Sequence, residues 1–275
     1  MTRPQLIDAW IQPWPAEAAT AIPPHRRNTH IQRKFNPDDR KARAIPNATL
    51  IAEMDEAGVD FALLSGGPAV PMPAVLELLD KYPERFAGVA WTDPTQGIVA
   101  AQRELEHLAR NYNIVGYKLE PFLLWKDPVD RVFYPMYAKC AELDITLQTQ
   151  VGGCMPLYPS RTGHPMFIDE IALDFPELRI VCGHVGGPWV DEMIHVAWKH
   201  ENVWIDTSAR LPRLFEPEFL KFLRSYGSDT CIFASDWPIL DFRRPVSQLD
   251  ALELSPEVRD KFCSANAAKA FKLTF

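Results

Sequence analysis

The segment IVCGHVGGPW, residues Ile180–Trp189, has the pattern of a buried strand that stops at a histidine. Its first three residues are apolar and prone to form strands. The Gly-Gly-Pro sequence that follows prevents a simple continuation of that strand. His184 therefore stands where a predicted buried strand ends and a loop begins, and apolar residues recur at helical spacing from Trp189 onward. In parallel α/β folds, ligands bind at this edge of the sheet.

A second predicted strand of the same kind ends at an aspartate. Residues Cys231–Pro238, CIFASDWP, form an apolar run that stops at Asp236. A single histidine in such a position is about as often a hydrogen-bonded interior group as a ligand. Two polar residues that end two buried strands of one sheet favour a functional site instead.

Length, charge and cysteine content set the class of protein. The chain has 275 residues, a formal net charge of −7 and 47% hydrophobic residues, which suits one α/β barrel or two small domains. The acidic balance argues against nucleic-acid binding, and the apolar runs are too short to span a membrane. Five cysteines without regular spacing indicate reduced thiols. We expect a cytoplasmic protein with a small-molecule substrate and no membrane partner, and a homo-oligomer is an open alternative.

Strand-like and helix-like segments alternate along the whole chain. Such alternation predicts parallel βαβ units, and eight units suit a barrel. We therefore predict that residues 1–275 form a single α/β domain, a (β/α)8 TIM barrel. A helix over Ser255–Leu273 is expected to end the chain. The eight expected strands are Leu6–Trp10, Asp60–Leu64, Phe86–Trp91, Ile114–Glu120, Ile145–Val151, Leu178–His184, Val203–Thr207 and Thr230–Asp236.

A long loop follows the first expected strand. Residues Ile11–Pro46 show little periodicity and hold six prolines, and irregular connections of this length are usually functional. One interpretation is a solvated basic surface. The other is a lid over the barrel mouth whose guanidinium groups bind a carboxylate. The sequence leaves open which of its arginines touch a substrate: Arg26, Arg27, Arg33, Arg40 and Arg43.

Polar side chains end several of the expected strands. Because side chains alternate along a strand, residues spaced by two share a face, and the carboxyl ends of all strands meet at one mouth. Each polar residue also has a purely structural interpretation, such as a glutamine that bonds backbone or a lysine that pairs with a carboxylate. We expect Asp236, His184 and Lys118 to be catalytic and the following to bind substrate: Trp10, Gln12, Glu120, Gln150 and Trp237.

The chain resembles the amidohydrolase superfamily, specifically its amidohydrolase-2 branch. The resemblance rests on segments spread over nearly the whole chain, among them GYKLEP (Gly116–Pro121), FPELRIVCGHVGGPW (Phe175–Trp189) and FASDWP (Phe233–Pro238). That branch includes resorcylate-type decarboxylases and pyrone-dicarboxylate lactonase. The resemblance implies a TIM barrel that acts on small carboxylated substrates, with a divalent metal ion held at the mouth.

The chain departs from the family at the metal ligands. The family's first strand ends in a His-x-His pair, where this sequence has Trp10 and Gln12, and Gln150 stands at the position of a further histidine. Only His184 and Asp236 remain as metal ligands from the usual set. Zinc sites use three or four good ligands. We therefore expect no tightly bound cofactor, or a weakly bound divalent metal such as Zn, Mn or Mg.

These observations lead to one main functional hypothesis and two alternatives. The main hypothesis is a hydrolase acting on a small carboxylated or cyclic substrate with a lactone-like or ester-like bond. Asp236 would be the general base, His184 would orient or protonate, and Lys118 would neutralise an anionic oxygen. The first alternative is a decarboxylase (carboxy-lyase) of a small aromatic or unsaturated carboxylic acid. The second is a non-catalytic barrel that binds a small molecule.

Overall fold

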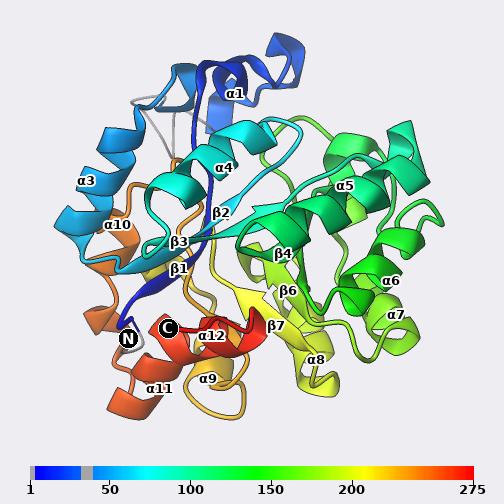
Figure 1. Cartoon of the computed structure of the whole chain (residues 1–275). Helices are drawn as coiled ribbons and strands as arrows, with labels where there is room; N and C mark the ends of the chain where they lie inside the picture. The colour runs from blue at the N-terminus through cyan, green and yellow to red at the C-terminus, as the bar shows by residue number, and fades with distance from the viewer. Residues whose placement is uncertain (1–3, 32–39) are drawn as a thin grey trace.

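The computed structural model describes residues 4–31 and 40–275, and its centre is a barrel of eight parallel strands (Figure 1). Each strand pairs in parallel with the next along the chain, so all eight expected strands are confirmed and the TIM-barrel prediction is correct. The strands are β1 (Ile7–Ile11), β2 (Phe61–Ser65), β3 (Phe86–Ala90), β4 (Ile114–Leu119), β5 (Thr146–Gln150), β6 (Ile180–Gly183), β7 (Val203–Asp206) and β8 (Cys231–Ile232).

The barrel closes between β8 and β1, although β8 is only two residues long. The chain beyond β8 continues beside β1 and exchanges backbone hydrogen bonds with it. Gln12 N donates to Trp237 O at 2.9 Å, and Asp236 N donates to Trp10 O at 3.0 Å. This pairing holds Asp236 beside the end of the first strand, which is how two distant parts of the sequence come to share one mouth.

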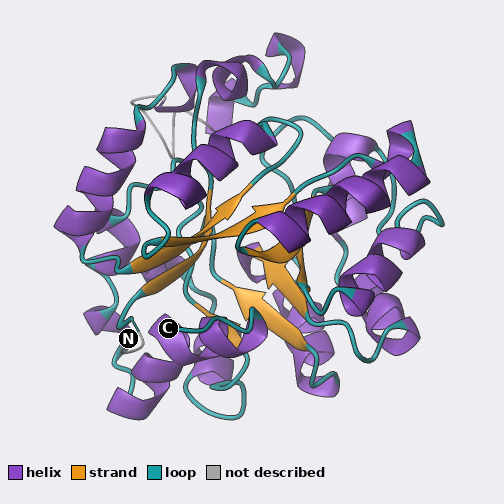
Figure 2. Cartoon of the chain, in the orientation of Figure 1, coloured by secondary structure: helices purple, strands orange, loops and turns teal. Residues whose placement is uncertain are grey.

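Helices surround the strands, as Figure 2 shows in purple. The described helices that follow β2 to β7 are α4 (Met72–Lys81), α5 (Ile98–Asn111), α6 (Tyr134–Glu142), α7 (Met166–Asp174), α8 (Val190–Lys199) and α9 (Pro217–Leu223). α3 (Asn47–Ala57) precedes β2, and α10 (Arg243–Val246) follows β8. None of the helices described is long and apolar enough to cross a membrane.

The helix expected over Ser255–Leu273 is interrupted. It consists of α11 (Pro256–Asp260), a π-helical turn η9 (Lys261–Ala265) and α12 (Asn266–Ala270). The Phe262 carbonyl accepts a hydrogen bond from Phe233 N at 2.9 Å, and Ser264 Oγ donates to the carbonyl of Pro4. The first of these bonds takes a backbone carbonyl that the regular helical ladder would use, and side-chain periodicity reveals neither bond.

The C-terminal segment closes the N-terminal end of the barrel. Phe271 packs with apolar residues of the barrel interior, including Ile7 and Val181, and is almost fully buried. Thr146 Oγ1, at the start of β5, donates to the Ala270 carbonyl at 2.6 Å. With this end filled, the opening of the barrel lies at the C-terminal ends of the strands.

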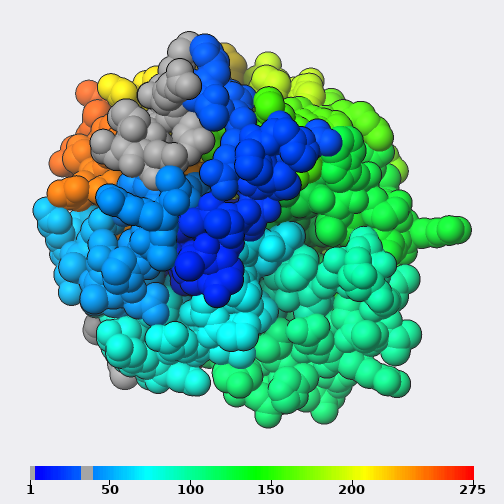
Figure 3. Space-filling view, turned by 90° about the horizontal axis from the view of Figure 1, so that it is seen from above, coloured from blue at the N-terminus to red at the C-terminus, as the bar shows by residue number. Residues whose placement is uncertain are grey.

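The connection from β1 to β2 contains short helices in its described part. They are α1 (Ala16–Thr20), η1 (Pro24–Arg26) and η2 (Arg40–Ala42). Trp14 ties the two ends of this connection together, since its Nε1 donates to Lys41 O at 3.1 Å and its carbonyl accepts from Ile45 N at 2.8 Å. Seen from above, the dark blue part of the connection covers the centre of the face (Figure 3).

Candidate active site

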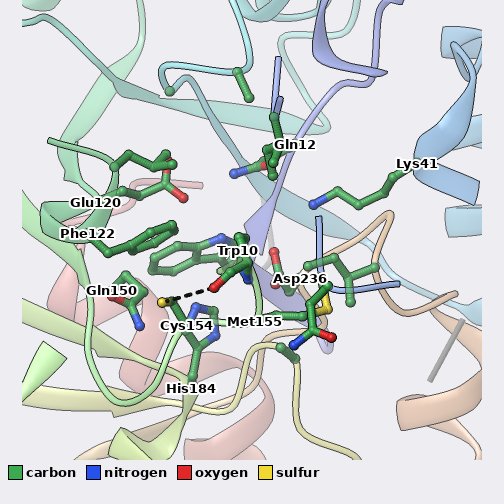
Figure 4. A pocket seen from close by; sticks show the side chains of 18 of the residues that line it. Trp10, Gln12, Lys41, Glu120, Phe122, Gln150, Cys154, Met155, His184 and Asp236 are labelled. Carbon is green, nitrogen blue, oxygen red and sulfur yellow. Dashed lines mark hydrogen bonds between the residues drawn. The ribbon is translucent and has the colours of Figure 1, made fainter. Parts of the chain in front are cut away.

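A cavity of about 520 Å³ opens at the C-terminal ends of the strands. Side chains from β1, β5 and the segments that follow β4, β6 and β8 point into it (Figure 4). The described residues of the β1–β2 connection add Trp14, Arg27 and Lys41 to the wall. Six of the residues expected at the site line this one cavity: Trp10, Gln12, Glu120, Gln150, His184 and Asp236.

Two expected site residues lie off the cavity wall. Lys118 is fully buried, and its Nζ lies 4.6 Å from the ring centroid of Trp10 and 3.7 Å from Glu120 Oε2. Trp237 is also fully buried: its Nε1 donates to Glu53 Oε2 at 2.7 Å, and its ring stacks on Phe242. Trp237 thus packs under the β1–β2 connection, and Lys118 lies behind the Trp10 indole.

The alternation of side chains breaks where strand β6 ends. Val181 packs inside the barrel and Cys182 packs in the outer apolar layer, so regular alternation would turn His184 outward. His184 instead has a φ of 68°, and Asp236, after β8, has a φ of 64°. Residues other than glycine rarely adopt this left-handed conformation, which turns the His184 side chain towards the cavity.

Asp236 is the carboxyl group at the floor of the cavity, and only 5% of the residue is exposed. Burial raises its pKa to about 7, while the ammonium groups of Lys41 and Lys118 oppose that rise and the carboxylate of Glu120 adds to it. A carboxyl group with a pKa near 7 is suited to accept and return a proton at neutral pH.

A hydrogen-bonded chain behind His184 determines its tautomer. His184 Nδ1 lies 3.0 Å from the carbonyl of Ser208 and 2.8 Å from Ser208 Oγ. A carbonyl can only accept, so Nδ1 carries the proton and the neutral ring leaves Nε2 as a bare acceptor. The Ser208 hydroxyl donates in turn to the carboxylate of Asp206, and burial raises the pKa of that group to about 6. Burial also lowers the pKa of His184, so the neutral imidazole is favoured.

Lys41 brings a positive charge to the cavity from the β1–β2 connection. Its Nζ lies 4.4 Å from the ring centroid of Trp14, and Figure 4 shows it on the same side as Asp236. Burial lowers the pKa of Lys41, and the carboxylates of Asp236 and Glu120 oppose that change. A ligand carboxylate in the cavity would oppose the lowering further, so an anionic ligand and the charged form of Lys41 favour each other.

Gln150 presents an acceptor to the same cavity. Its Nε2 donates to Gly152 O at 2.9 Å, which fixes the amide, whereas its buried Oε1 has no hydrogen-bond partner among the described residues. A buried acceptor without a partner is costly unless a ligand or water donates to it. Gln150 is thus arranged to accept a hydrogen bond from something in the cavity.

The donor set does not fit the divalent metal ion that the family resemblance implies. Trp10 has no lone pair to offer, and Gln12 and Gln150 are neutral and weak ligands. The buried ammonium group of Lys118 has no hydrogen-bond partner among the described residues and faces the indole at 4.6 Å. The ammonium group of Lys118 thus already places a positive charge next to the position that a metal ion would take.

The arginines of the β1–β2 connection have different surroundings. Arg27 lines the cavity, and its guanidinium also donates to the backbone carbonyls of Ile22 and Ala19. Arg26 lies over the ring of Trp125 at 4.8 Å, and Arg40 pairs with Glu53 at 2.7 Å. Arg43 is exposed, and Arg33 lies outside the described residues.

Four polar residues in or below the site are absent from the set expected from the sequence. Lys41 comes from a segment whose path no periodicity predicts. Asp206 and Ser208 follow the same alternation along β7 that identified the glutamines of β5, so the spacing contained that signal. Asp8 lies deeper on β1, where burial raises its pKa to about 7.

Known proteins resemble this chain in sequence. A 2-keto-4-carboxy-3-hexenedioate hydratase from Sphingobium sp. is 27% identical over 184 residues, which are 54% of each chain. The match thus spans about half the length of that relative. A gamma-resorcylate decarboxylase from Rhodococcus jostii is 26% identical over 248 residues, 70% of this chain and 72% of the relative.

Solved structures show the same fold at lower identity. An uncharacterized TIM-barrel protein from Bordetella bronchiseptica has a TM-score of 0.79 at 21% identity, covering 97% of this chain and 98% of that one. A probable 2-pyrone-4,6-dicarboxylic acid hydrolase from Acinetobacter baumannii has a TM-score of 0.68 at 16% identity, covering 98% of this chain and 100% of that one. A 5-carboxyvanillate decarboxylase from Novosphingobium aromaticivorans, complexed with manganese, has a TM-score of 0.74 at 19% identity, covering 98% of this chain and 96% of that one.

The amidohydrolase family itself matches residues 7–273. The match begins with β1 and ends just after α12, so it includes every strand of the barrel and every residue of the cavity named above. The protein therefore belongs to the amidohydrolase family of enzymes.

Proposed function

We propose that this protein is a hydrolase of a small carboxylated lactone or ester, with Asp236 as the general base. The observation that carries the proposal is the nearly buried carboxyl group of Asp236 at the cavity floor, whose pKa is raised to about 7. A base with this pKa is half ionised at neutral pH and can return its proton later in the reaction.

The proposed reaction uses the chain's own acid–base groups. A water molecule donates one hydrogen bond to Asp236 and one to the bare Nε2 of His184, and Asp236 takes its proton as the oxygen attacks the ester carbonyl. The ring C–O bond then breaks, and Asp236 returns the proton to the leaving oxygen. Gln150 Oε1 accepts a hydrogen bond from the substrate.

Positive charge near the cavity explains the preference for an anionic substrate. Lys41 lines the cavity and holds the substrate carboxylate. Lys118 acts from behind Trp10, where its charge favours the ionised form of Asp236. We propose that this chemistry needs no tightly bound metal ion, and that residues 1–275 work as a single domain.

Decarboxylation is the second candidate, because aromatic rings form part of the cavity wall. Trp10, Trp14 and Phe122 offer flat apolar surfaces to a ring-shaped acid. In this reaction, protonated Asp236 would give its proton to the ring carbon that loses carbon dioxide. The two reactions differ in their product, since hydrolysis adds one water and decarboxylation removes one carbon dioxide.

The test is turnover of three probes by the purified chain. They are 2-pyrone-4,6-dicarboxylate, 5-carboxyvanillate and gamma-resorcylate, with products identified by mass spectrometry. Opening of the pyrone supports the main proposal, and loss of carbon dioxide from either aromatic acid supports the second. Asp236→Asn should reduce kcat by about 100-fold to 10,000-fold, because an amide cannot accept the proton. Full activity of the folded variant would show that Asp236 is not the general base.

A further inference from the structure

The positions that correspond to the metal ligands of the resembling family all line this cavity. Trp10, Gln12, Gln150, His184 and Asp236 come from four different strand ends, and each lines the same cavity. Each of these side chains can therefore be compared with the metal ligand that the family has at the same position.

The Trp10 indole fills the space at the first of these positions. The ring is 1% exposed, and its centroid lies 5.1 Å from the centroid of the His184 ring. Packing against β6 is close, since a Cβ added to Gly183 would come within 2.8 Å of Trp10 Cζ3. The indole is thus held by its surroundings and has no ring lone pair for a cation.

The Lys118 ammonium group supplies positive charge behind the ring. Its Nζ lies 4.6 Å from the Trp10 centroid, a distance at which a cation is attracted by an aromatic face. Glu120 Oε2 lies 3.7 Å away, which is too far for a hydrogen bond but close enough for an ion pair. A divalent ion bound at the floor of this cavity would be a second cation next to a buried one.

We propose that Trp10 and Lys118 together replace the metal ion of the family: the indole takes its space and the ammonium group takes its charge. Lys41 adds a second single charge from the β1–β2 connection, so two lysines face the carboxylates of Asp236 and Glu120. The inference rests on the proposed function for one claim, that the chemistry needs no tightly bound metal ion, whereas the assignment of Asp236 as the base is tested by turnover. The readout of the inference is metal binding, so the inference and the assignment of Asp236 can each fail alone.

The test measures binding of Mn²⁺ and Co²⁺ by the purified full chain. After dialysis, the wild-type protein should retain clearly less than one equivalent of either metal. The triple variant Trp10→His, Gln12→His, Gln150→His restores the imidazoles but keeps Lys118, and it should bind weakly. Adding Lys118→Met to that background should tighten binding by about tenfold or more, the range found for groups around a metal site.

Two further variants separate charge from shape. In the three-histidine background, Lys118→Arg keeps the positive charge and should bind metal as weakly as the parent. Lys221→Met removes a lysine that is 70% exposed on α9 and should change nothing. Circular dichroism and thermal melting establish folding for each variant.

Two results would overturn the proposal. One is stoichiometric Mn²⁺ retained by the wild-type protein, a measurement that depends on no variant. The other is equal affinity of the folded Lys, Arg and Met forms at position 118, since the ammonium charge would then have no part in excluding the metal ion.

Discussion

At the scale of single residues, ionisation at the cavity floor follows from burial more than from pairing. Asp236 and Asp206 both have raised pKa values, and desolvation is the largest cause for each. The lysines near Asp236 reduce this effect without cancelling it. The residue that does the chemistry in our account therefore titrates near neutral pH.

The first prediction at this scale is a pH dependence. Because the pKa of Asp236 is raised to about 7, the group is protonated below that pH and cannot act as a base. For the pyrone probe, log(kcat/KM) should level off above pH ~7 and fall by about one unit per pH unit below it. A profile that stays flat from neutral pH down to pH ~5 would contradict Asp236 as the base.

The second prediction concerns the tautomer of His184. Ser208→Ala removes one of the two acceptors of Nδ1–H and leaves the Ser208 carbonyl in place. Losing one hydrogen bond of this kind should lower kcat by about five- to tenfold, with little change in KM. Ser225→Ala on the exposed surface serves as the control. An unchanged kcat would show that the bond does not position His184.

Some of this residue-level arrangement was predictable, and some was not. Gln12, Gln150, His184 and Asp236 were found because spacing by two and strand ends place side chains at the mouth. Trp237 was expected to bind substrate but packs away from the cavity, because alternation places it on the opposite face from Asp236. The local sequence gives no sign of the turn at His184, which has a φ of 68°.

At the scale of elements, the strands were easier to predict than the β1–β2 connection. Buried parallel strands are rich in apolar residues, and most of the eight appear in the sequence as short apolar runs, although β5 alternates with glutamines. The connection has no such pattern, and tertiary bonds such as Trp14 Nε1 to Lys41 O determine its path. That is why Lys41 was missed while β6 and β8 were found.

The prediction for this element is that Lys41 acts in substrate binding. Lys41→Met removes the ammonium group from the cavity wall and should raise KM for the pyrone dicarboxylate by about tenfold or more at neutral pH, with kcat less affected. Lys221→Met is the matched control on an exposed helix face. A variant with unchanged KM would place Lys41 outside the substrate contacts.

The end of the barrel opposite the site gives a stability prediction. Phe271 is 1% exposed and packs among the interior residues of the barrel. Phe271→Ala should lower the free energy of unfolding by about 3–5 kcal/mol, measured by urea denaturation. Val99→Ala, at a residue 58% exposed, should stay within about 0.5 kcal/mol of wild type. Equal stability of the two variants would mean that the packing of Phe271 contributes nothing to the free energy of unfolding.

At the scale of the whole molecule, one barrel fold carries different reactions in different relatives. The family match runs from residue 7 to residue 273, and the fold is shared with solved structures that have decarboxylase and hydrolase names. The scaffold was therefore predictable from end to end. The replacement of imidazoles by Trp10, Gln12 and Gln150 was visible in the sequence, but the cation behind Trp10 needed the structure.

The most direct measurement is the rate of pyrone opening by the wild-type enzyme after exhaustive treatment with a chelator, with and without added Mn²⁺. Our account attributes the reaction to Asp236 and two lysines. It predicts that kcat is unchanged by the chelator, unchanged by Mn²⁺ and lost in Asp236→Asn. Loss of activity with the chelator, restored by one equivalent of Mn²⁺, would contradict it.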